Sequence, residues 1–294
     1  MNQDISRKVN IYMFMVFVFW TALYVFNIVK GYQKDSFLLL YGTIAALMLS
    51  LIVFVLWHSV LTKGWRRSAV IFTTAVLVPF FAEALGVNYG LWFGPYDYTD
   101  MLGPKLLGVP IVIVLAWEPI LYSSFYITEI LVTSADVADA PLIRRLGYFA
   151  GTSLIASIVV TSWDMMMDPI AVNQGWWLWE NGGPYVSRIG GGVPLSNYIG
   201  WMGVAFICTF VHRSVAGKPP KPLATPNVYY GPMLVYAFLF LAAECIAVTM
   251  HGLPDVALAG LLGMGGFLVL AAVKLNTFHP RLEIPVLAAK GGTR

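Results

Sequence analysis

The sequence predicts an all-α integral membrane protein, built as one bundle of about eight transmembrane helices. Its 294 residues are 59% hydrophobic and only 11% charged, whereas a soluble domain carries about 25% charged residues. The mean hydropathy is +0.74. The apolar residues gather in runs of about 20, the length of helix that crosses the hydrocarbon core of a bilayer. We therefore expect a multi-pass protein of the cell membrane with a single transmembrane domain over residues 1–294.

Eight apolar runs follow one another along the chain. The first run follows Arg7 and Lys8, as in a signal peptide. It is nevertheless long and aromatic and lacks a small-residue cleavage site, so we expect a retained helix. Short tails are expected at 1–10 and 274–294. The predicted spans cover residues 11–29, 37–57, 69–88, 108–133, 147–168, 195–212, 229–250 and 256–273.

The basic residues are distributed unevenly between the two sides of this arrangement. Fourteen of the 18 Lys and Arg residues fall in segments on the same side as the amino terminus. Cytoplasmic loops are enriched in Lys and Arg, which predicts that both termini are cytoplasmic. The segments at 89–107 and 169–194 are then external loops. The four basic residues predicted on the outer side are Lys30, Lys34, Lys105 and Arg188.

Several function classes are excluded by what the chain lacks. The net charge of +3 comes without a basic tract that could hold nucleic acid. Cys208 and Cys245 both lie in apolar runs, which argues against a disulfide framework or a thiolate metal cluster. The histidines are isolated from one another, unlike those of membrane di-iron hydroxylases, and no nucleotide-binding glycine motif is present. We assign no metal and no cofactor.

Acidic residues inside the spans are the strongest indication of a functional site. A charged side chain at the bilayer centre costs about 2.5–3.5 kcal/mol on insertion scales, so such residues are usually functional. The alternative is that they tie helices together structurally. Four of the five fall in the predicted outer half, and no cation is expected beside them. These five acids are Glu83, Glu118, Glu129, Asp164 and Glu244.

Asp164 and Asp168 form the leading candidate acid/base pair. They lie one helical turn apart, on the same face of the predicted helix. A carboxyl group in an apolar pocket without a cation can remain protonated, and a protonated carboxyl is a proton donor. Trp163 precedes Asp164 in the chain, and a ring face beside a proton donor can stabilise a carbocation. Most other aromatic residues of the outer side fit an interfacial belt.

Two other interpretations remain open for these features. The Asp164-x-x-x-Asp168 spacing is similar to a magnesium–diphosphate motif, but intramembrane prenyltransferases need a longer Asn/Asp-rich motif and a second Asp-rich segment. A transporter or lipid-binding scaffold is the competing class, since Pro79, Pro119 and the glycine-rich segments could break helices.

Six segments of the chain together carry a family resemblance. They are Phe81-Ala-Glu-Ala-Leu-Gly, Phe93-Gly-Pro-Tyr-Asp-Tyr-Thr, Leu102-Gly-Pro-Lys-Leu-Leu-Gly-Val-Pro, Thr161-Ser-Trp-Asp-Met-Met-Met-Asp-Pro, Gly175-Trp-Trp-Leu-Trp-Glu and Gly192-Val-Pro-Leu-Ser-Asn-Tyr-Ile-Gly-Trp. With these segments the chain resembles carotenoid biosynthesis membrane proteins of the carotenoid 1,2-hydratase type, which include the bisanhydrobacterioruberin hydratases. The resemblance extends from about residue 79 to 213. Glu118 departs from the family pattern, which lacks an acid there, and this leaves room for a related reaction.

The resemblance implies addition of water to a terminal isoprenoid double bond of an acyclic carotenoid, without cofactor or redox change. The residues agree in kind: a buried acid protonates the alkene, and a second carboxylate orients the water that captures the cation. Capture by a second double bond would make the protein a cyclase instead. The expected partners are a lipophilic polyene that enters from the bilayer, water, and as candidates other enzymes of the carotenoid pathway. The oligomeric state is left open.

The predicted site lies in the outer half, between the spans at 69–88, 108–133, 147–168 and 229–250. We expect Glu83 and Glu118 to line the same cavity as Asp164 and Asp168. The predicted substrate-binding residues are Trp163, Trp117, Tyr96, Asp97, Asn197, Trp201 and Glu244.

Overall fold

The computed structural model describes residues 37–132, 140–180, 184–185, 192–215, 227–249 and 252–278, together with seven positions between 11 and 22. Most of the span predicted at 11–29 and the predicted tail at 1–10 lie outside the described residues. Helix α9 runs to Phe278 and so includes the first five residues of the tail that was predicted at 274–294; residues 279–294 lie outside the described residues.

The described elements are helices joined by short loops and four very short strands. In chain order they are α2 (Phe37–Lys63), α3 (Trp65–Tyr89), β1 (Tyr96–Tyr98), η1 (Asp100–Leu102), β2 (Lys105–Leu106), β3 (Val109–Pro110), α4 (Ile111–Leu131), α5 (Leu142–Gln174), β4 (Trp177–Trp179), α6 (Leu195–Val215), α7 (Asn227–Thr249), α8 (Pro254–Gly260), η2 (Leu261–Gly265) and α9 (Gly266–Phe278).

Within the described part of the chain, seven helical segments are long and apolar enough to cross a membrane. They correspond to the seven predicted spans from residue 37 onward, so the all-α polytopic prediction is confirmed. The last span is one continuous rod in which α8 and α9 are joined by η2, a single π-helical turn. Helix α5 has 33 residues and extends beyond both ends of its predicted span.

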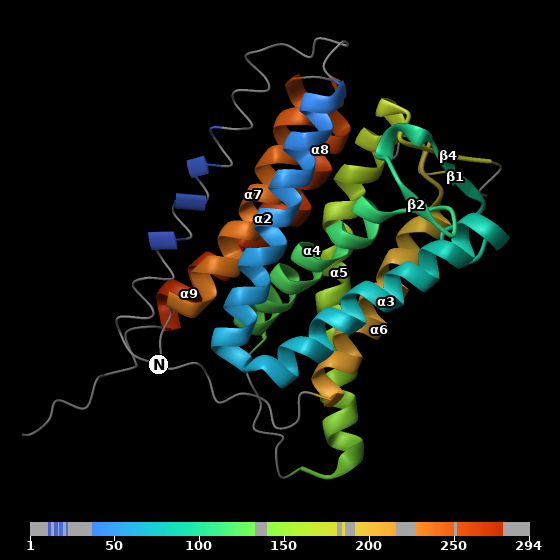
Figure 1. Cartoon of the computed structure of the whole chain (residues 1–294). Coiled ribbons are helices and arrows are strands. Elements are labelled where there is room, and N and C mark those ends of the chain that lie inside the picture. The colour runs from blue at the N-terminus through green and yellow to red at the C-terminus, as the bar shows by residue number, and fades with distance from the viewer. Residues whose placement is uncertain are drawn as a thin grey trace, which may run out of the picture.

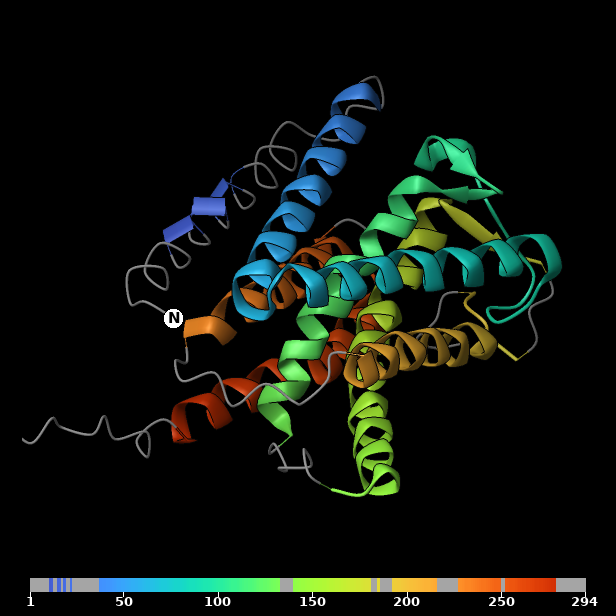
Figure 2. The same ribbon diagram turned by 60° about the horizontal axis from the view of Figure 1, so that its bottom comes forward.

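Helix α4 lies at the centre of the bundle (Figures 1 and 2). It contacts α2, α3, α5, α6, α7 and α9. Of its span, 72% is buried inside the protein, compared with 28% for α2. A helix in this position has few lipid-facing positions, so its polar side chains face other helices and can contribute to a site.

A single residue separates α2 from α3. Gly64 has φ +81°, a left-handed conformation that glycine adopts without steric cost. The chain therefore reverses sharply, and α3 crosses the bundle obliquely from this corner toward the strands (Figure 1). This crossing brings Glu83, near the far end of α3, to the strand-bearing end of the molecule.

The two loops that were predicted to be external pair with each other. Strand β1 runs antiparallel to β4, with Tyr96 opposite Trp179 and Tyr98 opposite Trp177. The loop before β1 packs closely on α6, where a Cβ atom at Gly200 would lie 2.7 Å from the Trp92 carbonyl oxygen. The antiparallel pair of β1 and β4, called the β-ribbon below, therefore caps the bundle at the ends of α3 and α6.

Basic residues from distant segments meet at the carboxyl end of α4. Arg213 Nη1 donates to Glu129 Oε1 at 2.6 Å, and Lys274 Nζ donates to the Leu131 carbonyl at 2.6 Å. The expectation that the span acids lack cationic partners is thus wrong for Glu129, because α6 brings Arg213 to the same depth. Which side of the membrane this end faces stays a prediction.

Candidate active site

A small cavity lies under the β-ribbon, among α3, α4, α5 and α6. Its volume is about 40 Å³. That is room for a few water molecules and well below the roughly 300–1,000 Å³ of pockets that hold whole small molecules. The lining residues are Glu83, Tyr96, Tyr98, Ile113, Ala116, Trp117, Trp163, Met167, Asp168, Trp177, Trp179, Asn197 and Trp201.

Three hydrogen-bond donors converge on the Glu83 carboxyl group. The Tyr98 hydroxyl donates to Oε2 at 2.9 Å, and the Tyr96 hydroxyl donates to the same oxygen. Trp117 Nε1 donates to Oε1 at 3.2 Å. Only 3% of Glu83 is exposed, so these donors replace the water it has lost. Donors held in place by a folded scaffold are typical of a carboxylate that works in its ionised form.

The two tyrosines of this cluster lie on β1, outside the spanning helices. Burial and the neighbouring Glu83 charge raise the pKa of the Tyr96 and Tyr98 hydroxyls well above the usual value for tyrosine. Both hydroxyls therefore keep their protons and remain donors over the whole physiological pH range.

Asn197 connects the two aspartates of α5. Its Nδ2 donates to Asp164 Oδ2 at 2.9 Å and also to Asp168 Oδ2. Asp168 lines the cavity, whereas Asp164 lies one turn deeper and does not reach it. Both are buried, and Asp164 Oδ1 has no hydrogen-bond partner within the described residues. Two carboxyl groups held by one amide, with no cation among their described contacts, are suited to sharing a proton.

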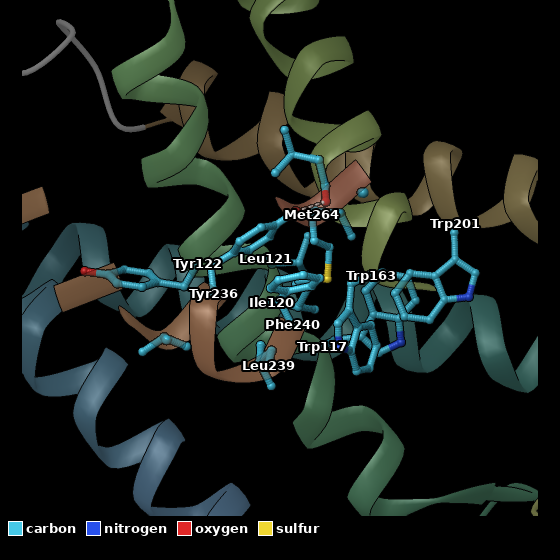
Figure 3. Close-up of a cluster of buried hydrophobic side chains, with 14 of the residues drawn as sticks. Trp117, Ile120, Leu121, Tyr122, Trp163, Trp201, Tyr236, Leu239, Phe240 and Met264 are labelled. Atoms are coloured by element: carbon cyan, nitrogen blue, oxygen red, sulfur yellow. Dashed lines mark hydrogen bonds between the residues drawn. The ribbon is translucent and has the colours of Figure 1, made fainter. Parts of the chain in front are cut away.

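Indole rings form the apolar wall of the cavity. The Trp117 and Trp201 rings stack with centroids 3.7 Å apart and planes 16° apart. The Trp163 ring lies 5.7 Å from that of Trp201. Figure 3 shows the three rings grouped at one end of the buried hydrophobic cluster. Such ring faces attract positive charge through their quadrupole.

One of the comparisons with known proteins identifies the family of this chain. Residues 37–266 match the sequence profile of the carotenoid biosynthesis protein family, which is most of the chain. The chain belongs to this family. No curated protein and no solved structure matches it significantly. The match is wider than the resemblance between residues 79 and 213, and it includes every residue of the cavity in this carotenoid biosynthesis protein.

The residues predicted for the site are mostly, but not all, brought together. Glu83, Asp168 and Asn197 line the cavity with Trp117, Trp163, Trp201 and Tyr96, and Asp164 lies directly behind them. Asp97 does not line it, because side chains alternate along β1 and its own is exposed. Tyr98, Trp177 and Trp179 line the cavity although they were not predicted. The Tyr-Asp-Tyr and Trp-Leu-Trp alternation was the signal that could have found them.

Glu118 lies in a different place from the one predicted. It lines a second cavity of about 20 Å³ between α3, α4 and α6, with Cys208, Thr209 and His212. Successive residues of a helix point about 100° apart. Trp117 therefore faces the first cavity and Glu118 faces away from it. The expectation that Glu118 shares a cavity with Asp164 and Asp168 is wrong.

One of the helices predicted to surround the site is wrong. Helix α6 supplies Asn197 and Trp201, whereas no residue of α7 lines the cavity. Glu244 of α7 is partly exposed and does not line the cavity. Helix α7 packs on another face of α5, where the Tyr236 hydroxyl contacts Ser162 Oγ at 2.9 Å. Among the described residues, no three His, Cys, Asp or Glu side chains are placed to hold a metal ion.

Proposed function

We propose that this member of the carotenoid biosynthesis protein family hydrates a terminal isoprenoid double bond of an acyclic carotenoid. The observation that carries the proposal is the combination in one site of three buried carboxyl groups, indole rings and room for water. The family membership supplies the class of substrate. The geometry supports acid–base chemistry on an apolar molecule.

The proposed reaction begins with proton transfer from the Asp164–Asp168 pair. The carboxyl proton bonds to the less substituted carbon of the double bond, and the π electrons of that bond form the new C–H bond. A tertiary carbocation remains on the other carbon. The faces of Trp117, Trp163 and Trp201 stabilise it, since an aromatic ring attracts a cation by roughly 0.5–2 kcal/mol.

Water from the cavity then captures the cation. A lone pair of the water oxygen forms the C–O bond, and the surplus proton returns to the aspartate pair. Glu83 holds the water in position and balances the positive charge, because its three donors keep the carboxylate in a fixed orientation. The products are a tertiary alcohol and the regenerated acid, so the step needs no cofactor.

Cyclisation shares the protonation step and differs in what captures the cation. If a second double bond of the polyene reaches the cation before water does, a ring forms and a proton leaves. The room for water beside Asp168 favours hydration over this alternative.

Pigment analysis of a carotenoid-producing host, with and without this chain, tests the proposal. Hydration predicts a new pigment that is heavier by one water per modified end. A pigment of unchanged mass but altered absorption spectrum would show cyclisation. An unaltered pigment profile, with the protein present in the membrane, would contradict both reactions and favour a transporter or a lipid-binding scaffold.

A further inference from the structure

A much larger hollow lies at the periphery of the helical bundle, between α5, α6 and the continuous helix formed by η2 and α9. Its volume is about 540 Å³, within the range of pockets that hold whole ligands. The walls include Met165, Met202 and Phe267. Ile158 and Leu270 on its rim are 44% and 57% exposed, so the hollow opens toward the surroundings of the bundle, where the lipid would be.

The hollow shares a wall with the candidate active site. Thr161 and Met165 of α5 and Tyr198 of α6 face the hollow, whereas Asp168 and Asn197 face the small cavity. The Asp164–Asn197 hydrogen bond lies between the two, at the contact of α5 with α6. A molecule in the hollow would therefore lie one layer of side chains from the carboxyl pair.

Two buried hydroxyl groups mark this shared wall. Thr161 is 6% exposed and Tyr198 is 8% exposed. Neither hydroxyl has a hydrogen-bond partner within the described part of the chain. Both oxygens are themselves buried, so Thr161 and Tyr198 present mainly carbon atoms to the hollow, which suits an apolar chain.

Gly266 at the start of α9 lines the hollow without a side chain. A Cβ atom at Gly266 would meet no other atom within 4 Å. Next to it, η2 is a π-helical turn, a feature that is frequent at functional sites. The hollow therefore has room at Gly266 for a larger side chain, which would take up part of its volume.

We infer that this hollow is the binding groove for the polyene chain of the substrate. The inference rests on the proposed function and extends it. The small cavity has about 40 Å³ and cannot hold a carotenoid chain. The chain lies in the groove, open to the bilayer, and its end group passes between α5 and α6 at the level of Asp164 to reach the indole rings.

The groove is tested by filling it from Gly266. In the full-length protein in lipid nanodiscs, Gly266→Leu should reduce the binding of an acyclic polyene at least tenfold, which corresponds to about 1.4 kcal/mol. Binding is measured from the absorption of the retained polyene. Gly147→Leu is the matched control: Gly147 also lies in a helix and has no atom within 4 Å of a built Cβ, but it is exposed and lies outside the groove.

The outcomes separate this inference from the proposed function. Equal polyene binding by the two variants would contradict the inference that the polyene binds in the hollow, even if the wild-type protein hydrates its substrate. Bilayer lipid would then be the expected occupant of the hollow. If the wild-type protein hydrates nothing, the binding comparison still decides whether a polyene occupies the groove.

Discussion

The two small cavities described above, one under the β-ribbon and one between α3, α4 and α6, are each lined by a buried glutamate, but the two glutamates differ in their hydrogen bonds. Glu83 in the first cavity accepts hydrogen bonds from Tyr96, Tyr98 and Trp117. Glu118 in the second cavity has both carboxyl oxygens buried without a partner among the described residues. The comparison teaches that burial alone does not fix the orientation of an acid in a membrane bundle, whereas positioned donors do.

The difference arises from what surrounds each glutamate. The first cavity lies under the β-ribbon, which supplies two tyrosines from outside the helices, and beside the aspartates of α5. The second lies between helices alone, where the polar lining residues besides Glu118 are Tyr122, Cys208, Thr209 and His212. The Tyr122 hydroxyl is hydrogen-bonded to His58 Nδ1 at 2.7 Å. The Thr209 hydroxyl is already used, because it donates to the Ala205 carbonyl at 2.8 Å. The second cavity therefore offers Glu118 no organised set of donors.

The largest effect is expected from the aspartate pair of the first cavity. Asp168→Asn and Asp164→Asn should each lower the hydration rate by at least about 100-fold, the usual contribution of a general acid or base. Asparagine keeps the shape and the hydrogen bonding but carries no acidic proton. Glu244→Gln changes a span acid that lines neither cavity and should retain activity. Full turnover by both aspartate variants, with the protein folded, would mean that the acid lies elsewhere.

A smaller effect is expected from the donors around Glu83. Tyr98→Phe removes one of the three hydrogen bonds to the carboxylate. We expect kcat to fall by roughly 10–100-fold, somewhat less than the loss of a direct transition-state donor. KM should change little, because Tyr98 orients Glu83 and the bulk of the chain binds in the groove. Tyr89→Phe is the control, since Tyr89 is 74% exposed. An equal loss in the two variants would contradict a positioning role for Tyr98.

The smallest effect is expected in the second cavity. Glu118→Gln should keep activity within a few-fold of the wild type, because Glu118 lines no part of the first cavity. Glu118→Leu replaces an unpartnered buried carboxyl by an apolar group, so the melting temperature in detergent should stay the same or rise. A loss of about 100-fold in the hydration activity of both variants would contradict this distinction between the cavities. It would indicate that Glu118 takes part in proton transfer.

Much of the fold could be predicted from local pattern. Hydropathy runs of membrane length locate spanning helices directly, because backbone groups in lipid must be satisfied within the helix. The pairing of Asp164 with Asp168 was also predictable, since residues four apart lie on one helical face. The tryptophans of the cavity were harder to predict from the sequence. Trp163 was identified only from its position before Asp164 in the chain, and its ring lines the cavity.

What the sequence by itself determined was therefore the helices, their number from residue 37 onward and the acids they carry. Only the tertiary structure decided which faces meet: α6 instead of α7 beside Asp164, Trp117 and Glu118 in separate cavities, and β1 paired with a strand that lies 81 residues further along. The physical reason is that lipid tails are as apolar as leucine, so hydropathy shows that a helix spans but not which neighbour it packs against. That choice is made by the fit of side chains and by hydrogen bonds between distant segments, such as the one from Asn197 to Asp164.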